Sequence, residues 1–523
     1  MSHPSFLTSR TPRIVMRWLV PLAPLCLVAL IAAAHASIKP FWYDELATLL
    51  PAGLPTFTDC WNFYADGLDT PSPLPALFVH AMMKAHGPAE IMNRIPMMLG
   101  FLIMCLSLYG FTSRRYGRSY GVVALLLPVL TGVFYYSTEM RAYPIVLGAV
   151  AFALCCWQSA QEKRPAWLYQ SGVFIGLAVA MGSHVFAIFV IPAFMLGQWI
   201  HERSTNARHP RMWVAILLSP CSLLPQWEGM HRAREYYGSV FWSKPNIGHL
   251  LHSYNFTFAF GWFIPFVTVV ALGFLLARFD LLPLPARGAA SARGFKPEEW
   301  SIAWMLALVP FLALPVSCLI GAYCPRYVLA ANIGIFLLLV GGTAEALRGS
   351  RIAGATLALL LTASILALNL KTISKAFSCG SNLPAAIASC EDWLGILEAR
   401  KGEPVIVPDA FLFLVINHYG SSELKKRLYY LTDAACCTRQ KTNDDVNIRL
   451  FSRRLPLQTI DYPSFHENHQ NSLVAVYHYL EEKTSKELGL RPVGHFRSRY
   501  LDNNAPRHVS VYERTRGAGS GPE

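Results

Sequence analysis

Apolar residues gather in long stretches of the sequence that are nearly free of charge. Four clear examples are residues 18–36, 95–111, 256–277 and 352–370. A helix needs about 20 apolar residues to cross a hydrocarbon core of about 30 Å, and these stretches reach or approach that length. The pattern therefore predicts a polytopic α-helical membrane protein.

The number of predicted spans depends on one apolar block, residues 167–200. As a single helix, this block would be about 50 Å long at 1.5 Å per residue, which is too long for one crossing. Both of its flanks are basic, so we expect a tight hairpin that turns at Gly182-Ser183-His184. That gives about 11 transmembrane helices, predicted at residues 18–36, 92–111, 119–137, 140–158, 167–183, 184–200, 212–227, 256–277, 300–322, 327–343 and 352–370.

The composition agrees with a membrane protein, and the charge reveals its orientation. Only 15% of the residues are charged, against about 25% in soluble domains. The net charge of +13 comes largely from short segments that alternate with loops that are not basic. This alternation is typical of the positive-inside rule, so it predicts a topology and no nucleic-acid partner. The basic segments are 1–17, 112–118, 159–166, 201–211, 278–299 and 344–351.

An odd number of spans fixes where the two ends of the chain lie. The N-terminus is expected in the cytoplasm, and residues 371–523 are expected on the extracytoplasmic side. The first span ends in Ala34-His35-Ala36, which resembles a signal-peptide cleavage site. We interpret it as a retained anchor because its apolar run is long, and cleavage would leave the sidedness unchanged.

Two domains are predicted. Residues 1–370 form the transmembrane domain, whose first outer loop, 37–91, is rich in aromatic residues and is expected to lie at the membrane surface as short helices. Residues 371–523 have the composition of a soluble domain, and alternating strand and helix patterns predict an α/β fold. The expected strands are 404–407, 428–431, 473–477 and 509–512, and the expected helices are 391–400, 411–418 and 481–488.

Cysteines and the absence of familiar motifs limit the chemistry. Six cysteines fall outside the predicted spans, where a Cys379–Cys390 disulfide and free buried thiols are both open. The sequence has no Walker-type phosphate loop, dinucleotide glycine fingerprint, paired Cys-x-x-Cys or His-Glu-x-x-His. It therefore gives no sign of a soluble nucleotide or a structural zinc. The six cysteines are Cys60, Cys324, Cys379, Cys390, Cys436 and Cys437.

The candidate chemistry begins at Asp44-Glu45, which follows three aromatic residues just beyond the first span. Carboxylates among aromatic rings are costly unless they are paired or used. The simpler interpretation is an acidic pair at a helix N-terminus, where the macrodipole favours it. Both interpretations stay open on the sequence.

Two arginines lie on the same predicted membrane side. One is in the short loop Glu139-Met140-Arg141-Ala142-Tyr143, and the other is in Cys324-Pro325-Arg326-Tyr327. Such arginines often reach towards lipid headgroups without a catalytic role. A carboxylate and two cations on one side also fit a base and an anionic substrate.

These segments resemble those of the C-type (GT-C) membrane glycosyltransferases, which include the protein O-mannosyltransferases and the lipid A aminoarabinose transferases. The resemblance covers about residues 18–345, and the order of the segments is similar to that of bacterial members. This chain has Pro71-Ser72-Pro73-Leu74 where many relatives have His-Pro-Pro-Leu. The matching segments are Asp44-Glu45, Asp69 to Leu74 leading to His80, Asn93-Arg94-Ile95-Pro96, Glu139 to Tyr143, Ser183-His184 and Pro325-Arg326-Tyr327.

The resemblance implies an inverting transfer of a sugar from a polyprenyl-phosphate donor to a lipid, glycan or protein acceptor outside a bacterial inner membrane. In that interpretation Asp44 is the general base and Glu45 is a structural partner or a ligand of a possible divalent metal ion. Arg141 and Arg326 bind the donor phosphate. The further substrate-binding candidates are Glu139, Tyr143, Tyr327, Asp69, His80 and His184, with Asp66 as an acceptor-side alternative.

Two other functions compete with this hypothesis. A transporter or flippase of a lipid-linked glycan usually shows an internal repeat and polar residues at the bilayer midplane. This sequence has no internal repeat, and its candidate charges lie at the outer surface, which favours the enzyme. A non-catalytic membrane sensor is the third possibility, and in such a protein Asp44 would be dispensable.

Overall fold

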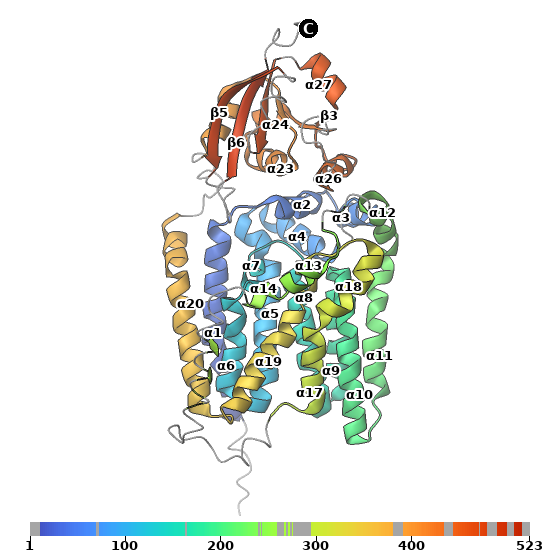
Figure 1. Cartoon of the computed structure of the whole chain (residues 1–523), viewed down its shortest axis with the longest axis vertical. Coiled ribbons are helices and arrows are strands. Elements are labelled where there is room, and N and C mark those ends of the chain that lie inside the picture. The colour runs from blue at the N-terminus through green and yellow to red at the C-terminus, as the bar shows by residue number, and fades with distance from the viewer. Residues whose placement is uncertain are drawn as a thin grey trace, which may run out of the picture. The chain divides into compact units, whose positions relative to one another are not determined.

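The computed structural model of the chain is shown in Figure 1. Its contacts divide the chain into two compact units. The helical unit comprises Met1–His35, Arg94–Pro225 and Ser243–Ser374, and the sheet unit comprises Ala36–Asn93, Gln226–Trp242 and Lys375–Glu523. The structure describes residues 11–69, 73–162, 165–238, 241, 243–258, 266–267, 270–271, 273, 275, 294–379, 391–432, 443–469, 471–477, 489–498 and 507–514.

Long apolar helices dominate the helical unit. Among the described residues, six helices are long and apolar enough to cross a membrane. A seventh span results if α17 and α18, which meet at a 41° bend, are counted as one. The six are α1 (Thr11–Ile38), α5 (Glu90–Tyr116), α8 (Tyr143–Glu162), α9 (Ala166–Ser183), α10 (Ile191–Thr205, with the preceding turn η2, Val185–Val190) and α20 (Arg351–Cys379); the bent pair is α17 (Pro297–Ala307) and α18 (Val309–Ile320).

The remaining predicted spans are shorter or interrupted, so the number eleven stays a prediction. Prolines account for two interruptions, because a proline removes a backbone N–H from the helix. Pro128 is the second residue of a 3₁₀ turn within the predicted span 119–137, and Pro220 is the second residue of another within 212–227. Most of 256–277 lies outside the described residues. The shorter elements are α6 (Arg118–Leu126), η1 (Leu127–Leu130), α7 (Val133–Ser137), α11 (Pro210–Leu218), η3 (Ser219–Gln226), α13 (Ile247–His252), α14 (Asn255–Phe258), η4 (Pro325–Val328) and α19 (Ala331–Ala346).

The predicted hairpin at residues 182–184 is confirmed. Helix α9 ends at Ser183, and His184 has an extended backbone with φ −159° and ψ 124°. The His184 Nδ1 accepts a hydrogen bond from the backbone N–H of Phe186 at 3.3 Å, which caps the following turn η2. Each arm of this hairpin is apolar and long enough to be a span.

Glycines let the helices of this unit approach closely. A Cβ at Gly148 of α8 would collide with the backbone of Gly100 on α5, and a Cβ at Gly176 of α9 would lie 2.8 Å from the carbonyl oxygen of Ala149 on α8. Small residues at such contacts are typical of membrane helix packing. Helix α8 is therefore held firmly between its neighbours, which fixes the position of Tyr143 at its start.

The described residues of the sheet unit form one six-stranded sheet with the strand order β3-β2-β1-β4-β6-β5. Strands β3, β2, β1 and β4 pair in parallel, and β6 pairs antiparallel with β4 and β5. The central strand β1 is buried at all three of its residues. The strands are β1 (Val405–Val407), β2 (Leu428–Leu431), β3 (Thr459–Ile460), β4 (Ser472–Tyr477), β5 (Leu490–Ser498) and β6 (Arg507–Arg514).

Most of the elements predicted for the C-terminal region are present. The four predicted strands correspond to β1, β2, β4 and β6, and two of the predicted helices correspond to α22 (Asp392–Ala399) and α23 (Ala410–Tyr419). The predicted helix 481–488 and Cys390, Cys436 and Cys437 lie outside the described residues. Three further helices in this region are α24 (Ser422–Lys426), α26 (Asn443–Phe451) and α27 (Tyr462–Asn468).

Residues 37–91 belong to the sheet unit and form short helices, as the sequence predicts. These are α2 (Tyr43–Ala52), α3 (Phe57–Ala65) and α4 (Pro73–His86), and a later segment of the same unit adds α12 (Trp227–Tyr237). The contacts thus group the first loop with the C-terminal residues, whereas the sequence places a domain boundary at residue 370.

Candidate functional site

Asp44 and Glu45 lie in the first turn of α2, where their environments differ. The side chain of Glu45 is fully buried, and its Oε2 accepts the backbone N–H of Trp42 at 3.4 Å. Glu45 therefore caps its own helix, which agrees with a structural role. Asp44 is only half-buried, and its backbone oxygen accepts the Thr48 hydroxyl at 3.1 Å. Of the two residues, Asp44 is the more exposed, although its Oδ2 atom is buried.

His80 and Asp69 take different places in the sheet unit. The Nδ1 of buried His80 lies 2.8 Å from the carbonyl oxygen of Ala52, so His80 ties α4 to the end of α2. Asp69 is buried, and the Tyr237 hydroxyl donates to the carbonyl of Leu68 beside it at 2.6 Å. Residues 70–72, which include the first two residues of the segment Pro71-Ser72-Pro73-Leu74, lie outside the described residues.

Asp66 is an ion-paired residue and not a solvated loop acid. Arg232 donates to its Oδ1 at 3.0 Å, and Arg454 donates from Nε to its Oδ2 at 2.6 Å. These arginines come from α12 and from the chain just after α26. Asp66 therefore joins three segments of the sheet unit that are far apart in the sequence.

In the helical unit, three predicted segments meet around a group of aromatic rings. The ring centroid of Tyr143 lies 6.5 Å from that of Tyr327 and 5.6 Å from that of His184. The rings of His184 and Tyr327 are 4.8 Å apart. The Arg326 guanidinium lies over the ring of Tyr143 at 6.0 Å from its centroid, within the range of a cation–π contact. We call Arg141, Tyr143, His184, Arg326 and Tyr327 the arginine–aromatic cluster.

A tight backbone connection positions Arg141 within this cluster. Residues 138–142 form the tight connection between α7 and α8, in which the Arg141 N–H donates to the Glu139 carbonyl at 2.8 Å. The Glu139 side chain is fully buried, whereas Arg141 and Arg326 are half-buried. Two half-buried cations thus accompany one buried carboxylate in these connections.

The charges of both arginines reach His184, which lies at the break between α9 and η2. Burial, followed by the positive charges of Arg141 and Arg326, lowers the pKa of His184 to about 3. Because its Nδ1 accepts the Phe186 N–H, the neutral ring carries its proton on Nε2. The positive charge of the cluster therefore comes from its arginines, and His184 can offer one N–H donor.

Several residues near the cluster were not singled out by the sequence. The ring of Tyr136 packs 5.1 Å from Tyr143, and the ring of Phe186 packs 5.1 Å from Tyr327. Among the described residues, the buried hydroxyls of Ser137 and Ser183 have no hydrogen-bond partner. Ser183 was marked by its place beside His184, but nothing in the sequence distinguished Tyr136, Ser137 or Phe186.

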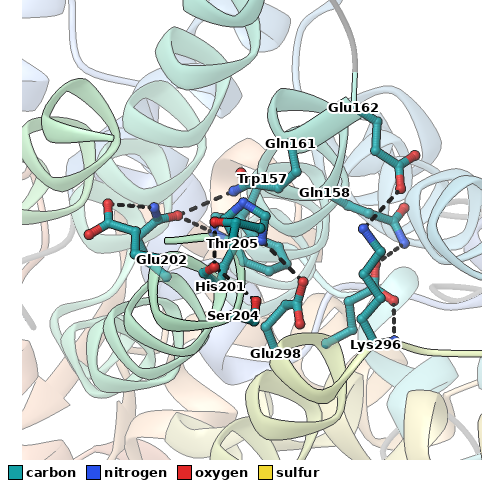
Figure 2. Close-up of polar contacts among 12 residues, drawn as sticks. Trp157, Gln158, Gln161, Glu162, His201, Glu202, Ser204, Thr205, Lys296 and Glu298 are labelled. Atoms are coloured by element: carbon teal, nitrogen blue, oxygen red, sulfur yellow. Dashed lines mark hydrogen bonds and ion pairs between the residues drawn. The ribbon is translucent and has the colours of Figure 1, made fainter. Parts of the chain in front are cut away.

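A second concentration of charge lies at the other end of the same helices (Figure 2). Arg115 binds Glu299 with two nitrogens, at 2.8 Å from Nε and 2.6 Å from Nη2, and also pairs with Glu162 at 2.7 Å. In Figure 2, His201 points towards Glu298 at 3.1 Å and Lys296 lies beside Glu162. We call these residues, with Gln158, Gln198 and Glu202, the polar network. These charged residues lie in the basic segments identified from the sequence, but which of them pair was not predicted.

The structure offers no metal centre among its described residues. No group of three or more His, Cys, Asp or Glu residues in that part of the chain could hold a metal ion.

Comparisons with known proteins agree with this architecture. Residues 69–227 match the family model described as dolichyl-phosphate-mannose-protein mannosyltransferase. No curated protein matches the sequence significantly.

Solved structures match over nearly the whole chain. The structure of ArnT from Cupriavidus metallidurans in the apo state has a TM-score of 0.56 at 12% identity, covering 98% of this chain and 99% of that one. The same protein bound to undecaprenyl phosphate has a TM-score of 0.52 at 12% identity, covering 98% and 100%. Together, the family match and the shared fold support a glycosyltransferase of the GT-C superfamily.

Proposed function

We propose that this protein is an inverting glycosyltransferase that moves a hexose or pentose from a polyprenyl-phosphate donor to an acceptor on the extracytoplasmic side. The observation that carries the proposal is that Arg326 lies over the ring of Tyr143 while the charges of Arg141 and Arg326 both act on the neutral His184. Such a site suits a phosphate group attached to an apolar chain. The ArnT structure bound to undecaprenyl phosphate and the name of the matched family point to the same class of donor.

The arginines match the charge that develops in the reaction. The donor is a phosphodiester with one negative charge, and the departing phosphomonoester carries about −1.5 to −2. Cations fixed where this charge appears stabilise the transition state more than the ground state. Phosphate leaves readily, so the reaction needs no general acid like that of the glycosidases.

Asp44 is the proposed general base. Its carboxylate takes the proton of the acceptor hydroxyl or amine as that atom attacks the anomeric carbon, while the bond from this carbon to the phosphate oxygen breaks. The bonding pair leaves with the phosphate, and the configuration at the anomeric carbon inverts. The partial exposure of Asp44 supports this role, whereas Glu45 is committed to its cap.

The remaining residues are proposed to contact the substrates. Glu139, Tyr143, Tyr327 and His184 would line the donor site, and Asp69 would serve the acceptor side. His80 would act there through its bond to Ala52 at the end of α2. The proposed orientation, with residues 371–523 outside a bacterial inner membrane, follows from the positive-inside pattern.

Replacing Asp44 with Asn tests the proposal. We expect transfer from a polyprenyl-phosphate sugar by the purified Asp44→Asn protein to fall by about 10²–10⁴, the usual contribution of a general base. Asp59→Asn is the matched control, because Asp59 caps α3 in the same unit and asparagine keeps that bond to Thr56. Transfer near the wild-type rate by Asp44→Asn would remove Asp44 from catalysis.

A further inference from the structure

Residues from the C-terminal part of the chain hold the start of α2. The ring of Tyr43 stacks on that of Phe411 in α23, with centroids 4.3 Å apart and planes 21° from parallel. The Tyr43 hydroxyl accepts a hydrogen bond from the buried amide of Asn447 in α26 at 3.0 Å. Tyr43 directly precedes Asp44, so these contacts act on the residue next to the proposed base.

A second set of contacts fixes the chain just before α2. The backbone N–H of Phe41 donates to the Tyr419 hydroxyl at 3.0 Å, and that hydroxyl donates to Glu90 at 3.2 Å. The Phe41 ring is fully buried and packs edge-on against His418 at 5.5 Å. Phe41 is therefore held by α23, and Tyr43 is held by α23 and α26.

Helix α2 needs this support because its own sequence defines its start poorly. The N-cap residue is Trp42, which has no side-chain oxygen to accept a backbone N–H. The capping contact from Glu45 is long, at 3.4 Å. A helix of ten residues is also marginal in water without tertiary contacts. The direction in which Asp44 points is therefore set by packing from outside α2.

Helix α26 and the residues just after it contact both α2 and α3. Asn447 contacts the start of α2, while Phe451 packs against Phe63 of α3 at 5.2 Å. Arg454, three residues further on, pairs with Asp66 at the end of α3. Because one short helix binds α2 and α3 together, a shift at Tyr43 would have to break contacts at Asp66 as well.

We propose that Asn447 and Phe411 are positioning residues, which orient Asp44 for proton transfer through their contacts with Tyr43. This inference rests on the proposed function and gives the C-terminal region a part in the reaction. It acts on the chemical step, since a base displaced by about 1 Å can cost up to 10²-fold in rate. Donor binding, assigned to the arginines of the helical unit, is untouched.

A double-mutant experiment tests the inference. Tyr43→Phe keeps the ring and removes the hydroxyl, which leaves the buried Asn447 amide without this hydrogen bond. We expect kcat to fall about tenfold with the donor KM unchanged, in line with the sensitivity of catalysis to orientation. Asn447→Leu should act similarly. The double variant should recover to within about threefold of wild type, because removing both polar partners together can be nearly neutral.

A matched control and a second readout separate positioning from folding. Arg400→Met breaks the ion pair of Arg400 with Glu513 at 2.8 Å, so it perturbs the same region away from α2 and should leave kcat per folded molecule unchanged. Hydrogen exchange measures the helix directly: the amides of residues 43–52 should exchange faster in Tyr43→Phe and Asn447→Leu, but not in Arg400→Met.

The outcomes distinguish this inference from the proposed function. An inactive Asp44→Asn protein together with full kcat in Tyr43→Phe and Asn447→Leu would overturn the positioning role alone. The positioning role would also be overturned if kcat in Tyr43→Phe and Asn447→Leu fell only in proportion to the fraction of folded protein and the double variant did not recover. Unchanged transfer in Asp44→Asn would instead overturn the proposed function, and the exchange result at α2 would still be measurable.

Discussion

The two ends of helix α8 both carry buried charge, but the charges are balanced differently. Tyr143 begins α8 and Glu162 ends it, about 30 Å apart at 1.5 Å per residue. Around Tyr143, Arg141 and Arg326 lie with the buried Glu139 and a histidine kept neutral. Around Glu162, acids and bases alternate and bind one another in the polar network.

We interpret this difference as one between a structural site and the proposed donor site. In the polar network, Glu299 receives Arg115, the Gln158 amide and the backbone N–H of Lys296, all within 3.0 Å. A carboxylate so fully bonded has little left to offer a substrate. In the arginine–aromatic cluster, Arg326 lies over the ring of Tyr143 and both arginines act on His184, a combination of charge and rings that suits a phosphate on an apolar chain. The sign of the local charge is therefore more informative than the amount of buried charge.

The largest expected effect comes from breaking the polar network. Arg115→Ala leaves the carboxylate of Glu299, which is 1% exposed, without its guanidinium. Removing one partner of a buried ion pair costs about 3–5 kcal/mol, so thermal unfolding in detergent should occur at a clearly lower temperature. Transfer per folded molecule should change little, because the network lies at the far end of α8 from the cluster.

Lys296→Ala is the matched control within the same network. The Lys296 ammonium lies 3.7 Å from Glu162, and both side chains are partly exposed, so its loss should cost less than about 1 kcal/mol. Alanine keeps the backbone N–H that Glu299 accepts. A loss of transfer in Arg115→Ala with unchanged unfolding would contradict the structural assignment of the network.

A smaller but more selective effect is expected at the opposite end. Arg326→Ala should raise the KM for the polyprenyl-phosphate donor about 10- to 100-fold, since a hydrogen bond to a charged group contributes about 1.5–3 kcal/mol. It should also lower kcat, because the same arginine is proposed to stabilise the charge that develops on the departing phosphate. Arg326→Lys should recover part of the loss, because lysine keeps the charge without the planar guanidinium. The KM for the acceptor should stay the same.

Arg203→Ala provides the comparison for this variant. Arg203 is exposed and lies over the Trp199 ring near the end of α10, so its removal should leave both KM values unchanged. Steady-state kinetics with each substrate varied in turn makes the measurement. Equal losses for donor and acceptor in Arg326→Ala would argue against a phosphate role for Arg326.

Features set by local sequence pattern were predicted well. The hairpin at His184 followed from the length of one apolar block and the charge of its flanks, and the strands around residues 405–407 and 473–477 followed from short apolar runs. The pattern was less complete within long apolar runs, because it predicted the length of a span but not the points where the helix is interrupted. Prolines at 128 and 220 interrupt two predicted spans, and the pattern counted these residues as ordinary members of apolar runs.

Features set by long-range contacts were not predictable from one sequence. The segments containing Arg141, His184 and Arg326 were marked individually, but only the fold brings their rings and charges together. Asp66 had no local sign of its two arginines, and Tyr43 had none of Asn447. These pairings depend on which elements pack together, and a one-dimensional pattern of apolar and polar residues does not contain that information.

The smallest expected effect is the response of donor binding to pH. With its pKa near 3, His184 stays neutral from pH 5.5 to pH 8, and a phosphodiester keeps one charge throughout this range. The donor KM should therefore vary less than about twofold, whereas a histidine with the ordinary pKa of about 6.5 would gain charge as the pH falls. Such a third cation would lower the donor KM at acidic pH.

Measuring the donor KM across this range in wild type and in His184→Gln distinguishes the two cases. Both proteins should give flat profiles, because glutamine replaces one neutral hydrogen-bonding side chain with another. A donor KM that falls below pH 6.5 in wild type but not in His184→Gln would assign a third positive charge to His184. The contrast between the two ends of α8 would then depend on pH, and the arginines would no longer account for the positive charge of the cluster by themselves.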